Sequence, residues 1–221
     1  MMTNLFSTFD PSTSMNLSMN WISSMLFLLV IPKNFWLLKS RSNFIFNKMM
    51  MIMYMEFKNL IPMYKKMIMF MISIFLYILI NNIMGLIPYI YTSSSQMLFS
   101  LSIALPMWMS IMLFGWINKN KMMFAHLVPT GTPTALMPFM VMIETISNLI
   151  RPGSLAVRLM ANMIAGHLIM SLLGNSIIEV NMVYKLLLMM VQILLMMFET
   201  AVSIIQAYVF STLSTLYSSE V

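Results

Sequence analysis

Long apolar runs constrain this chain more than any other feature of its sequence. A helix needs roughly 20 residues to cross about 30 Å of hydrocarbon, and runs of about that length or longer cover 15–38, 67–91, 96–117, 135–174 and 183–217. Only 8% of the 221 residues are charged and 60% are hydrophobic, whereas about a quarter of an ordinary soluble domain is charged. The sequence therefore predicts an all-α integral membrane protein, a single membrane domain over 1–221 with about five spanning helices.

The basic residues predict how these spans are oriented. They fall at the end of the first run or before the second, and again just after the third: Lys33, Lys39, Arg41, Lys48, Lys58, Lys65, Lys66, Lys119 and Lys121. Cytoplasmic or matrix loops carry this excess of Lys and Arg. We therefore expect the N-terminus outside, the segments 39–66 and 118–133 inside, and the C-terminus inside. The basic, Met-rich segment 44–62 is typical of an amphipathic helix on the inner surface.

Two pairs of spans are expected to form hairpins. The short polar turn 92–95 joins 67–91 to 96–117. The last two runs, 135–174 and 183–217, would extend about 60 Å and 52 Å as helices, so they must be strongly tilted or kinked in a bilayer. Pro152 and Gly153 are a candidate kink.

Several functional classes are excluded or disfavoured by residues that the sequence lacks. Cysteine is absent, which excludes disulfides and thiolate metal sites, and two histidines 41 positions apart make a zinc site improbable. The basic residues border apolar spans and form no nucleic-acid-binding patch. No nucleophile or nucleotide-binding motif is present, so we expect no self-contained catalytic site. From these observations together, we also expect no metal, no cofactor and no nucleic-acid partner.

An arginine without a nearby carboxylate stands out in the apolar string SLAVRLMANMIAGHLIM, 154–170. At 100° per residue, Arg158 shares one helix side with small or polar neighbours, namely Ala161, Asn162, Ala165 and Ile169. Small residues let another helix approach closely, so the counter-charge is expected on another polypeptide. The alternative is an internal ion pair with Glu144 or Glu199. His167 lies on the opposite side and is either functional or a hydrogen-bonded packing residue.

A polar stripe runs along the last apolar run. Lys185, Gln192, Glu199 and Gln206 recur every seven residues and therefore drift only about 20° per step, with Ser203 one turn from Glu199. Such a stripe is typical of a hydrated path or a polar helix seam. For the two glutamines, interhelical hydrogen bonds are an equally good interpretation. Glu144 is a further intramembrane carboxylate, toward the inner end of its run.

The strings RLMANMIAGH and ETAVSIIQAYVF, with HLVPTGTPTALMPFMVMIETISNLIRPGSLAVR before them, closely resemble subunit a of F-type ATP synthases in its animal mitochondrial form. The resemblance implies a non-catalytic stator of the proton-translocating Fo sector, which couples proton flow through two offset half-channels to rotation of a c-subunit ring and to ATP synthesis. It implies that Arg158 faces the essential c-ring carboxylate and that Asn162 faces the ring. His167, Glu199 and Gln206 match the half-channel from the intermembrane space and Glu144 matches the matrix-side exit, while Gln192 and Ser203 lie on the same polar stripe.

The resemblance also implies partners and a location. The partners are the c-ring, other Fo and peripheral-stalk subunits, the lipid bilayer and protons. The location is the mitochondrial inner membrane, with the N-terminus toward the intermembrane space and the C-terminus toward the matrix. The 32 methionines fit a mitochondrial gene in which AUA encodes Met. The rival hypotheses are a proton-coupled secondary transporter, disfavoured by the lack of an inverted repeat, and a purely structural membrane subunit.

Overall fold

The fold is a bundle of α-helices. The computed structural model describes residues 5–13, 17–32, 37–61, 65–128, 131, 133 and 136–220. Four of its helices are long and apolar enough to cross a membrane: α3 (Lys65–Leu86), α4 (Met97–Asn118), α6 (Met137–Glu179) and α7 (Met182–Glu220). A shorter apolar helical stretch covers Met19–Val30, and no strand occurs in the described ranges. The predicted all-α membrane fold is confirmed.

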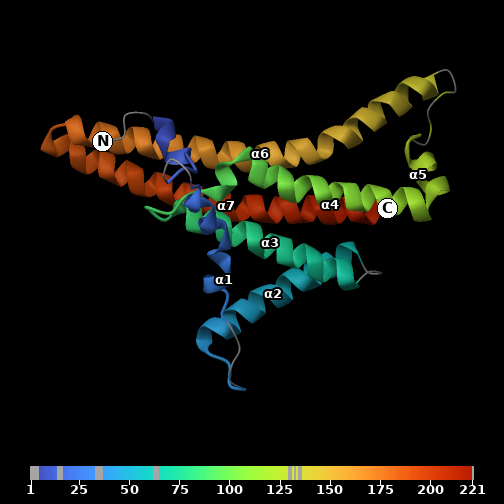
Figure 1. Cartoon of the computed structure of the whole chain (residues 1–221), viewed down its shortest axis with the longest axis horizontal. Helices are drawn as coiled ribbons and strands as arrows, with labels where there is room; N and C mark the ends of the chain where they lie inside the picture. Colours follow the sequence, from blue (N-terminus) through green and yellow to red (C-terminus); the bar gives the residue numbers. More distant parts are fainter. Residues whose placement is uncertain are drawn as a thin grey trace.

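The two longest helices form one extended hairpin. α6 has 43 residues and α7 has 39, which at 1.5 Å per residue gives about 65 Å and 58 Å. They are joined through Val180 and Asn181, and one end of the hairpin projects beyond the other helices (Figure 1). α6 contains Pro152, which removes a backbone hydrogen bond and favours a kink, and Figure 1 shows that the first part of α6 bends away from the rest. The tilt of this hairpin in a bilayer remains a prediction.

The last half of α7 lies between α3 and α4. α3 packs chiefly against α7, and α4 packs chiefly against α6 (Figure 1). The sequence explains this arrangement, because the face of α7 that packs inward is built from small residues, which are all buried: Ser203, Ala207, Ser211, Ser214 and Thr215. Small residues allow close helix approach, and each hydroxyl donates to a backbone carbonyl three residues earlier. α3 and α4 are thus joined by the predicted turn but pack mainly on the long hairpin.

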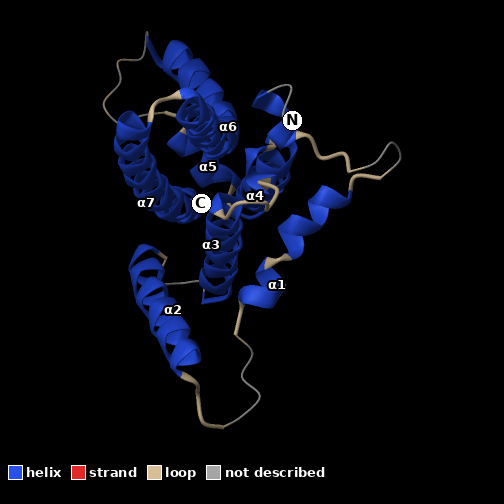
Figure 2. Cartoon of the chain, turned by 90° about the vertical axis from the view of Figure 1, so that its left-hand side faces the viewer, coloured by secondary structure: helices blue, strands red, loops and turns tan. Residues whose placement is uncertain are grey.

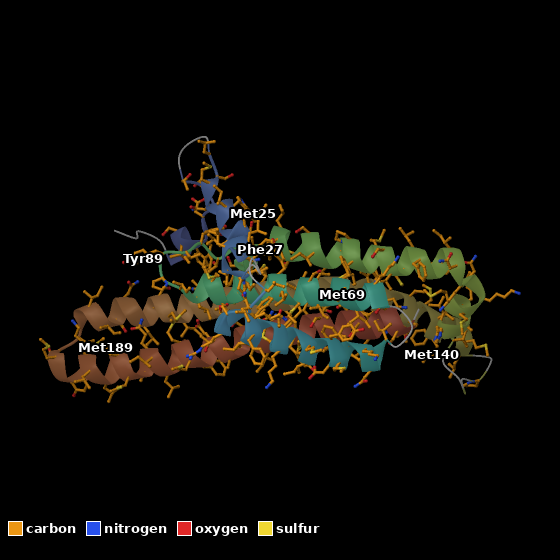
Figure 3. The ribbon with its side chains drawn as sticks, turned by 90° about the horizontal axis from the view of Figure 1, so that it is seen from below. Met25, Phe27, Met69, Tyr89, Met140 and Met189 are labelled. Atoms are coloured by element: carbon orange, nitrogen blue, oxygen red, sulfur yellow. The ribbon has the colours of Figure 1, made fainter. Side chains whose placement is uncertain are left out.

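The N-terminal part is assembled from shorter elements. A 3-10 helix, η2 (Met19–Met25), is followed by α1 (Phe27–Val30), and residues 15–16 and 33–36 of the predicted first span 15–38 lie outside the described residues. A continuous crossing by 15–38 therefore stays a prediction. The ring of Phe27 packs edge-on against Tyr77 of α3, with 4.9 Å between centroids, so this segment is held to the bundle by aromatic contact. Figure 3 labels Phe27 at that position.

The predicted amphipathic segment 44–62 falls mostly within α2 (Arg41–Leu60). Ser40 caps this helix, since its hydroxyl accepts from the Asn43 amide at 3.3 Å. Met53 and Phe57 are buried against the bundle, whereas Phe44 and Ile52 are exposed. Figure 2 places α2 on the opposite side of α3 from α6. An apolar face that stays exposed among the described residues fits a lipid surface, and that location stays a prediction.

Two short elements lie at opposite ends of α4. At its start, the turn after α3 includes the 3-10 helix η3 (Ser93–Ser95), whose serines are buried, and Tyr89, which has a φ of 68° and is fully exposed (Figure 3). At its end, α5 (Asn120–His126) follows directly. By the predicted orientation, the first is the outer end of the bundle and the second is the inner end.

Candidate functional site

The polar residues of the α6–α7 hairpin form two groups that are separated along its length. The outer group contains Asn162, His167, Glu199 and Gln206, and the inner group contains Glu144 and Arg151. Figure 3 labels Met189 and Met140, which lie near the two ends of this long axis. Arg158 lies on α6 between the groups.

Asn162 and Gln206 connect the two helices in the outer group. The Asn162 amide Nδ2 donates to Gln206 Oε1 at 2.8 Å, across 44 positions of sequence. Gln206 is buried, and its Nε2 has no hydrogen-bond partner within the described ranges. Asn162 is exposed at the hairpin surface. The pair therefore joins a buried position of the predicted stripe to the exposed side that carries Arg158.

Glu199 is the buried carboxylate of the outer group. Its residue is 8% exposed, and neither carboxylate oxygen has a hydrogen-bond partner among the residues that the structure describes. It packs directly against Gly166 of α6, where an added Cβ would lie 2.8 Å from the Glu199 Cδ. A buried carboxylate without a partner is costly when ionised, so this site favours binding of a proton.

Gly166 was missed by the sequence analysis, although it lies inside the string that contained Arg158 and His167. The signal was the spacing of small residues, since Ala161 and Ala165 precede it on the same helix. Only a glycine leaves room for the Glu199 carboxyl at this approach.

His167 follows Gly166 and turns toward the outer end of the bundle. It is partly buried, and its Nε2 is buried without a hydrogen-bond partner in the described part of the chain. Its ring meets the ring of Phe9 edge-on, with 6.4 Å between centroids and 82° between planes. The alternative for His167 was a packing residue held by hydrogen bonds. Among the described residues, no group forms such a hydrogen bond with Nε2.

Two cavities share part of their walls at His167, one beside the outer group and the other beside the N-terminal residues 7–10. One, of about 420 Å³, is lined by Asn162, Gly166 and Glu199. The other, of about 750 Å³, is lined by Asp10 and Gln192. Both also include His167 and Leu86 in their walls. Ionisable and polar side chains thus line two neighbouring cavities at this end of the bundle, an arrangement that suits stepwise proton transfer.

The remaining stripe residues divide between the path and the packing. Gln192 lines the larger outer cavity, whereas Lys185 is exposed near the end of the hairpin. Ser203 is fully buried, and its hydroxyl donates to the Thr200 carbonyl at 2.8 Å. Ser203 thus has a packing environment at the α7 surface that meets α3.

The inner group is built around an ion pair. Arg151 Nη2 lies 3.5 Å from Glu144 Oε1, and both side chains are about a third exposed, 27% and 32%. The guanidinium carbon of Arg151 also lies 4.9 Å from the centre of the Tyr217 ring on α7, a cation–π contact. Arg151 was not proposed as a site residue from sequence, although its spacing of seven from Glu144, two helical turns, was visible.

A cavity of about 290 Å³ surrounds this ion pair. Its walls include Glu144, Arg151 and Tyr217, together with Trp108, Asn148 and His126. His126, at the end of α5, is exposed and contributes to this wall. Among the described residues, no group of three His, Asp or Glu side chains could hold a metal ion.

Arg158 lies on an exposed face of α6. Its residue is exposed, and the described residues offer it neither a salt bridge nor a side-chain hydrogen bond. Glu144, one candidate for an internal pair, contacts Arg151 instead. A different face of α6 is buried at Leu155, Ala156 and Leu159, so packing within the chain fixes the helix and leaves the guanidinium facing outward.

Comparison with known proteins places these features in a family. A family model described as ATP synthase A chain matches residues 13–219. A protein named ATP synthase subunit a from Locusta migratoria is 61% identical over the full length of both chains. Proteins of the same name from Drosophila melanogaster and Aedes aegypti are 56% and 54% identical, again over the full length of both.

Proposed function

The chain belongs to the ATP synthase A chain family, and from this premise we propose that it is the proton-translocating stator subunit of the Fo sector. It is a multi-pass membrane protein that makes no ATP itself and directs protons past a rotating ring of c subunits. Its location is the mitochondrial inner membrane, with the N-terminus toward the intermembrane space and the C-terminus toward the matrix. Other Fo and peripheral-stalk subunits hold it still.

The observation that carries this proposal is the separation of the inner and outer cavities by Arg158. On α6, the inner cavity ends at Arg151 and the outer one begins at Asn162. These two residues are eleven positions apart, which corresponds to about 16 Å of helix, and the two cavities have no lining residue in common. Two half-channels that do not meet, with a cation between them, are what rotation-coupled transport needs.

The exposed face around Arg158 is the surface proposed to meet the c-ring. Every member of the small-residue side predicted from sequence is exposed in the chain: Arg158, Ala161, Asn162, Ala165 and Ile169. Small side chains allow a neighbouring helix to approach the guanidinium closely. A lone arginine near the bilayer centre costs about 2.5 to 3.5 kcal/mol, and a carboxylate on the ring offsets that cost.

The proposed cycle assigns a step to each group. A proton enters through the outer cavities past His167, passes Glu199 and protonates a ring carboxylate near Asn162. After rotation, the ring carboxyl reaches Arg158, whose permanent positive charge favours the ionised form, and the proton leaves through the inner cavity past Glu144. Arginine cannot deprotonate in proteins, so Arg158 acts as a fixed charge. A potential of 100 mV contributes about 2.3 kcal/mol per proton that crosses.

The Arg158→Ala variant tests this proposal. In reconstituted complexes whose assembly is checked on a native gel, ATP-driven pumping should be lost while passive proton leak is retained or raised. Arg41→Ala is the matched control, because it removes an exposed guanidinium from α2, and Arg41 lines neither cavity. Pumping at a near wild-type rate in assembled Arg158→Ala complexes would overturn the proposal.

A further inference from the structure

The N-terminal residues 7–10, here called the N-terminal strap, lie over the outer end of the bundle. Residues 7–9 are the last part of the 3-10 helix η1 (Leu5–Phe9), which contacts α6, and Asp10 follows it directly. The Phe9 carbonyl accepts two hydrogen bonds from the far side of the turn between α3 and α4. Gln96 Nε2 donates at 2.7 Å and the Tyr91 hydroxyl donates at 3.3 Å. Donors more than 80 positions away thus fix this carbonyl.

Phe9, whose carbonyl is fixed by these hydrogen bonds, also contacts His167 through its ring. The rings of Phe9 and His167 are 6.4 Å apart and nearly perpendicular. Ser7, Thr8, Phe9 and Asp10 all line the larger outer cavity together with His167. One wall of this cavity therefore comes from the N-terminal strap, and the imidazole rests against it.

Asp10 is a negative charge fixed at the open side of this cavity. Its carboxylate Oδ1 accepts from the Ser12 amide at 3.0 Å and from the Ser12 hydroxyl at 2.8 Å. Its backbone carbonyl accepts from Asn20 Nδ2 at 3.2 Å. The bonds from Ser12 hold the pKa of Asp10 below its ordinary value, so the group is ionised at neutral pH. Its side chain is exposed, outside the membrane-spanning helices.

We infer that the N-terminal strap forms the entrance of the outer half-channel, with Asp10 attracting protons to it and Phe9 acting as a positioning residue for His167. This inference rests on the proposed function, because it assigns parts to the outward path. A single-sign charge at the mouth of a low-dielectric cleft raises the local concentration of counter-ions and the rate of their arrival. Phe9 and Asp10 both lie outside the sequence motifs of the long hairpin.

The charge is tested with Asp10→Asn, which keeps the size and shape of the side chain. Proton uptake by reconstituted complexes should slow by about twofold to fivefold at low ionic strength, and the difference should shrink at 1 M salt, where the screening length is about 3 Å. The matched control is Glu56→Gln, which removes an exposed carboxylate from α2, away from the outer cavities, and should leave the rate unchanged. An Asp10→Asn rate equal to wild type at low salt would overturn the role of Asp10.

The wall is tested by chemical access, for which the absence of cysteine in the chain is an advantage. Met196 lines the same cavity as the strap, so Met196→Cys reports entry of a membrane-impermeant thiol reagent added from the outer side, detected by mass on this chain. Adding Phe9→Ala or Gln96→Leu should raise the labelling rate about tenfold or more. Asn181→Cys, at the exposed connection between α6 and α7, is the control and should label equally in all backgrounds. Unchanged labelling of Met196→Cys would overturn the strap as a wall.

The two proposals fail in different ways. If Glu199→Gln and Arg158→Ala stop coupled transport while the Asp10 and Phe9 variants behave as wild type, the strap inference falls and the proposed function stands. If Glu199→Gln complexes transport protons normally, the outward path itself is wrong and both fall.

Discussion

Two carboxylates on the same hairpin have opposite surroundings. Glu199 is buried and has no hydrogen-bond partner among the described residues, and it packs against a glycine. Glu144 is about a third exposed and pairs with Arg151, which also stacks on Tyr217. At the inner end the chain supplies the counter-charge for its carboxylate. At the outer end, no described residue supplies a counter-charge for Glu199.

This difference shows how surroundings set what a carboxylate does. A partly exposed ion pair contributes up to about 1 kcal/mol to stability. The pair between Glu144 and Arg151 therefore adds little to stability, and the Glu144 carboxylate stays accessible to water. A buried carboxylate without a partner is unfavourable unless it is protonated, so Glu199 suits a group that takes up and passes on a proton. The following predictions test this distinction, from the largest expected effect to the smallest.

The largest effect is expected from Glu199→Gln, compared with Glu144→Gln. Removing the outer carboxylate should reduce coupled proton transport by about 100-fold or more, in the range of a lost general acid–base group. Removing the inner one should cost about tenfold or less, because Glu144 is partly exposed and its cavity is also lined by the polar side chains of Asn148 and His126. ATP-driven pumping in assembled complexes measures both. Equal losses for the two variants would break the comparison.

A second prediction concerns the glycine that receives Glu199. In Gly166→Ala the new Cβ would lie 2.8 Å from the Glu199 Cδ, so the carboxyl must move, and transport should fall by about tenfold or more. Assembly should be retained, because the displaced atoms are the end of a flexible side chain. Gly174→Ala is the matched control on the same helix, since a Cβ there meets nothing within 4 Å. Equal transport in the two variants would show that the position of the carboxyl is unimportant.

The inner end gives a smaller, mainly structural prediction. Arg151→Gln removes a cation–π contact worth about 0.5 to 1 kcal/mol at an exposed site and a partly exposed ion pair. Hydrogen–deuterium exchange near Tyr217 should rise about fivefold, the change expected for about 1 kcal/mol, and Arg151→Lys should restore part of the protection. The double variant Tyr217→Leu with Arg151→Gln should exchange little faster than either single variant. Unchanged exchange in Arg151→Gln would contradict a stabilising clamp at this end.

The smallest effect is expected at Asp10 on changing pH. Hydrogen bonds from Ser12 lower the pKa of Asp10 below its ordinary value, so the folded strap binds a proton less readily than the unfolded chain. Its contribution to stability is therefore fully present above about pH 4 and is lost as pH falls through the lower folded pKa. Protease protection of the N-terminal segment should be the same at pH 7 and pH 5, whereas Ser12→Ala should reduce it at both. A fall in protection between pH 7 and 5 would contradict this assignment.

Much of the fold follows from hydropathy, but the neighbours of each helix do not. The long apolar runs indicate helices, and the seven-residue recurrence of Gln192, Glu199 and Gln206 predicts their common side, because helix geometry is local. That α7 lies between α3 and α4 depends on the buried serines of α7, which in the sequence read only as mild interruptions of an apolar run.

The site residues divide in the same way. Arg158, His167 and Glu199 are visible in the sequence because polar groups are rare in apolar helices. Gly166, Phe9 and the pairing of Glu144 with Arg151 were missed. The first two act through contacts that join distant parts of the chain, such as the bond from Gln96 to Phe9 across 87 positions. Local pattern carries no information about which distant residue fills the space beside a glycine.

The long hairpin has a consequence for the synthesis and turnover of the chain. Of the most apolar window of each helix, 56% is buried within the chain for α3 but only 11% for α7. A newly made copy thus presents most of the hairpin, with the exposed guanidinium of Arg158 on its face, to lipid until other subunits arrive. An unassembled copy of this kind is a ready substrate for membrane proteases. The abundance of this chain should therefore follow the supply of its assembly partners more closely than the amount of its own mRNA.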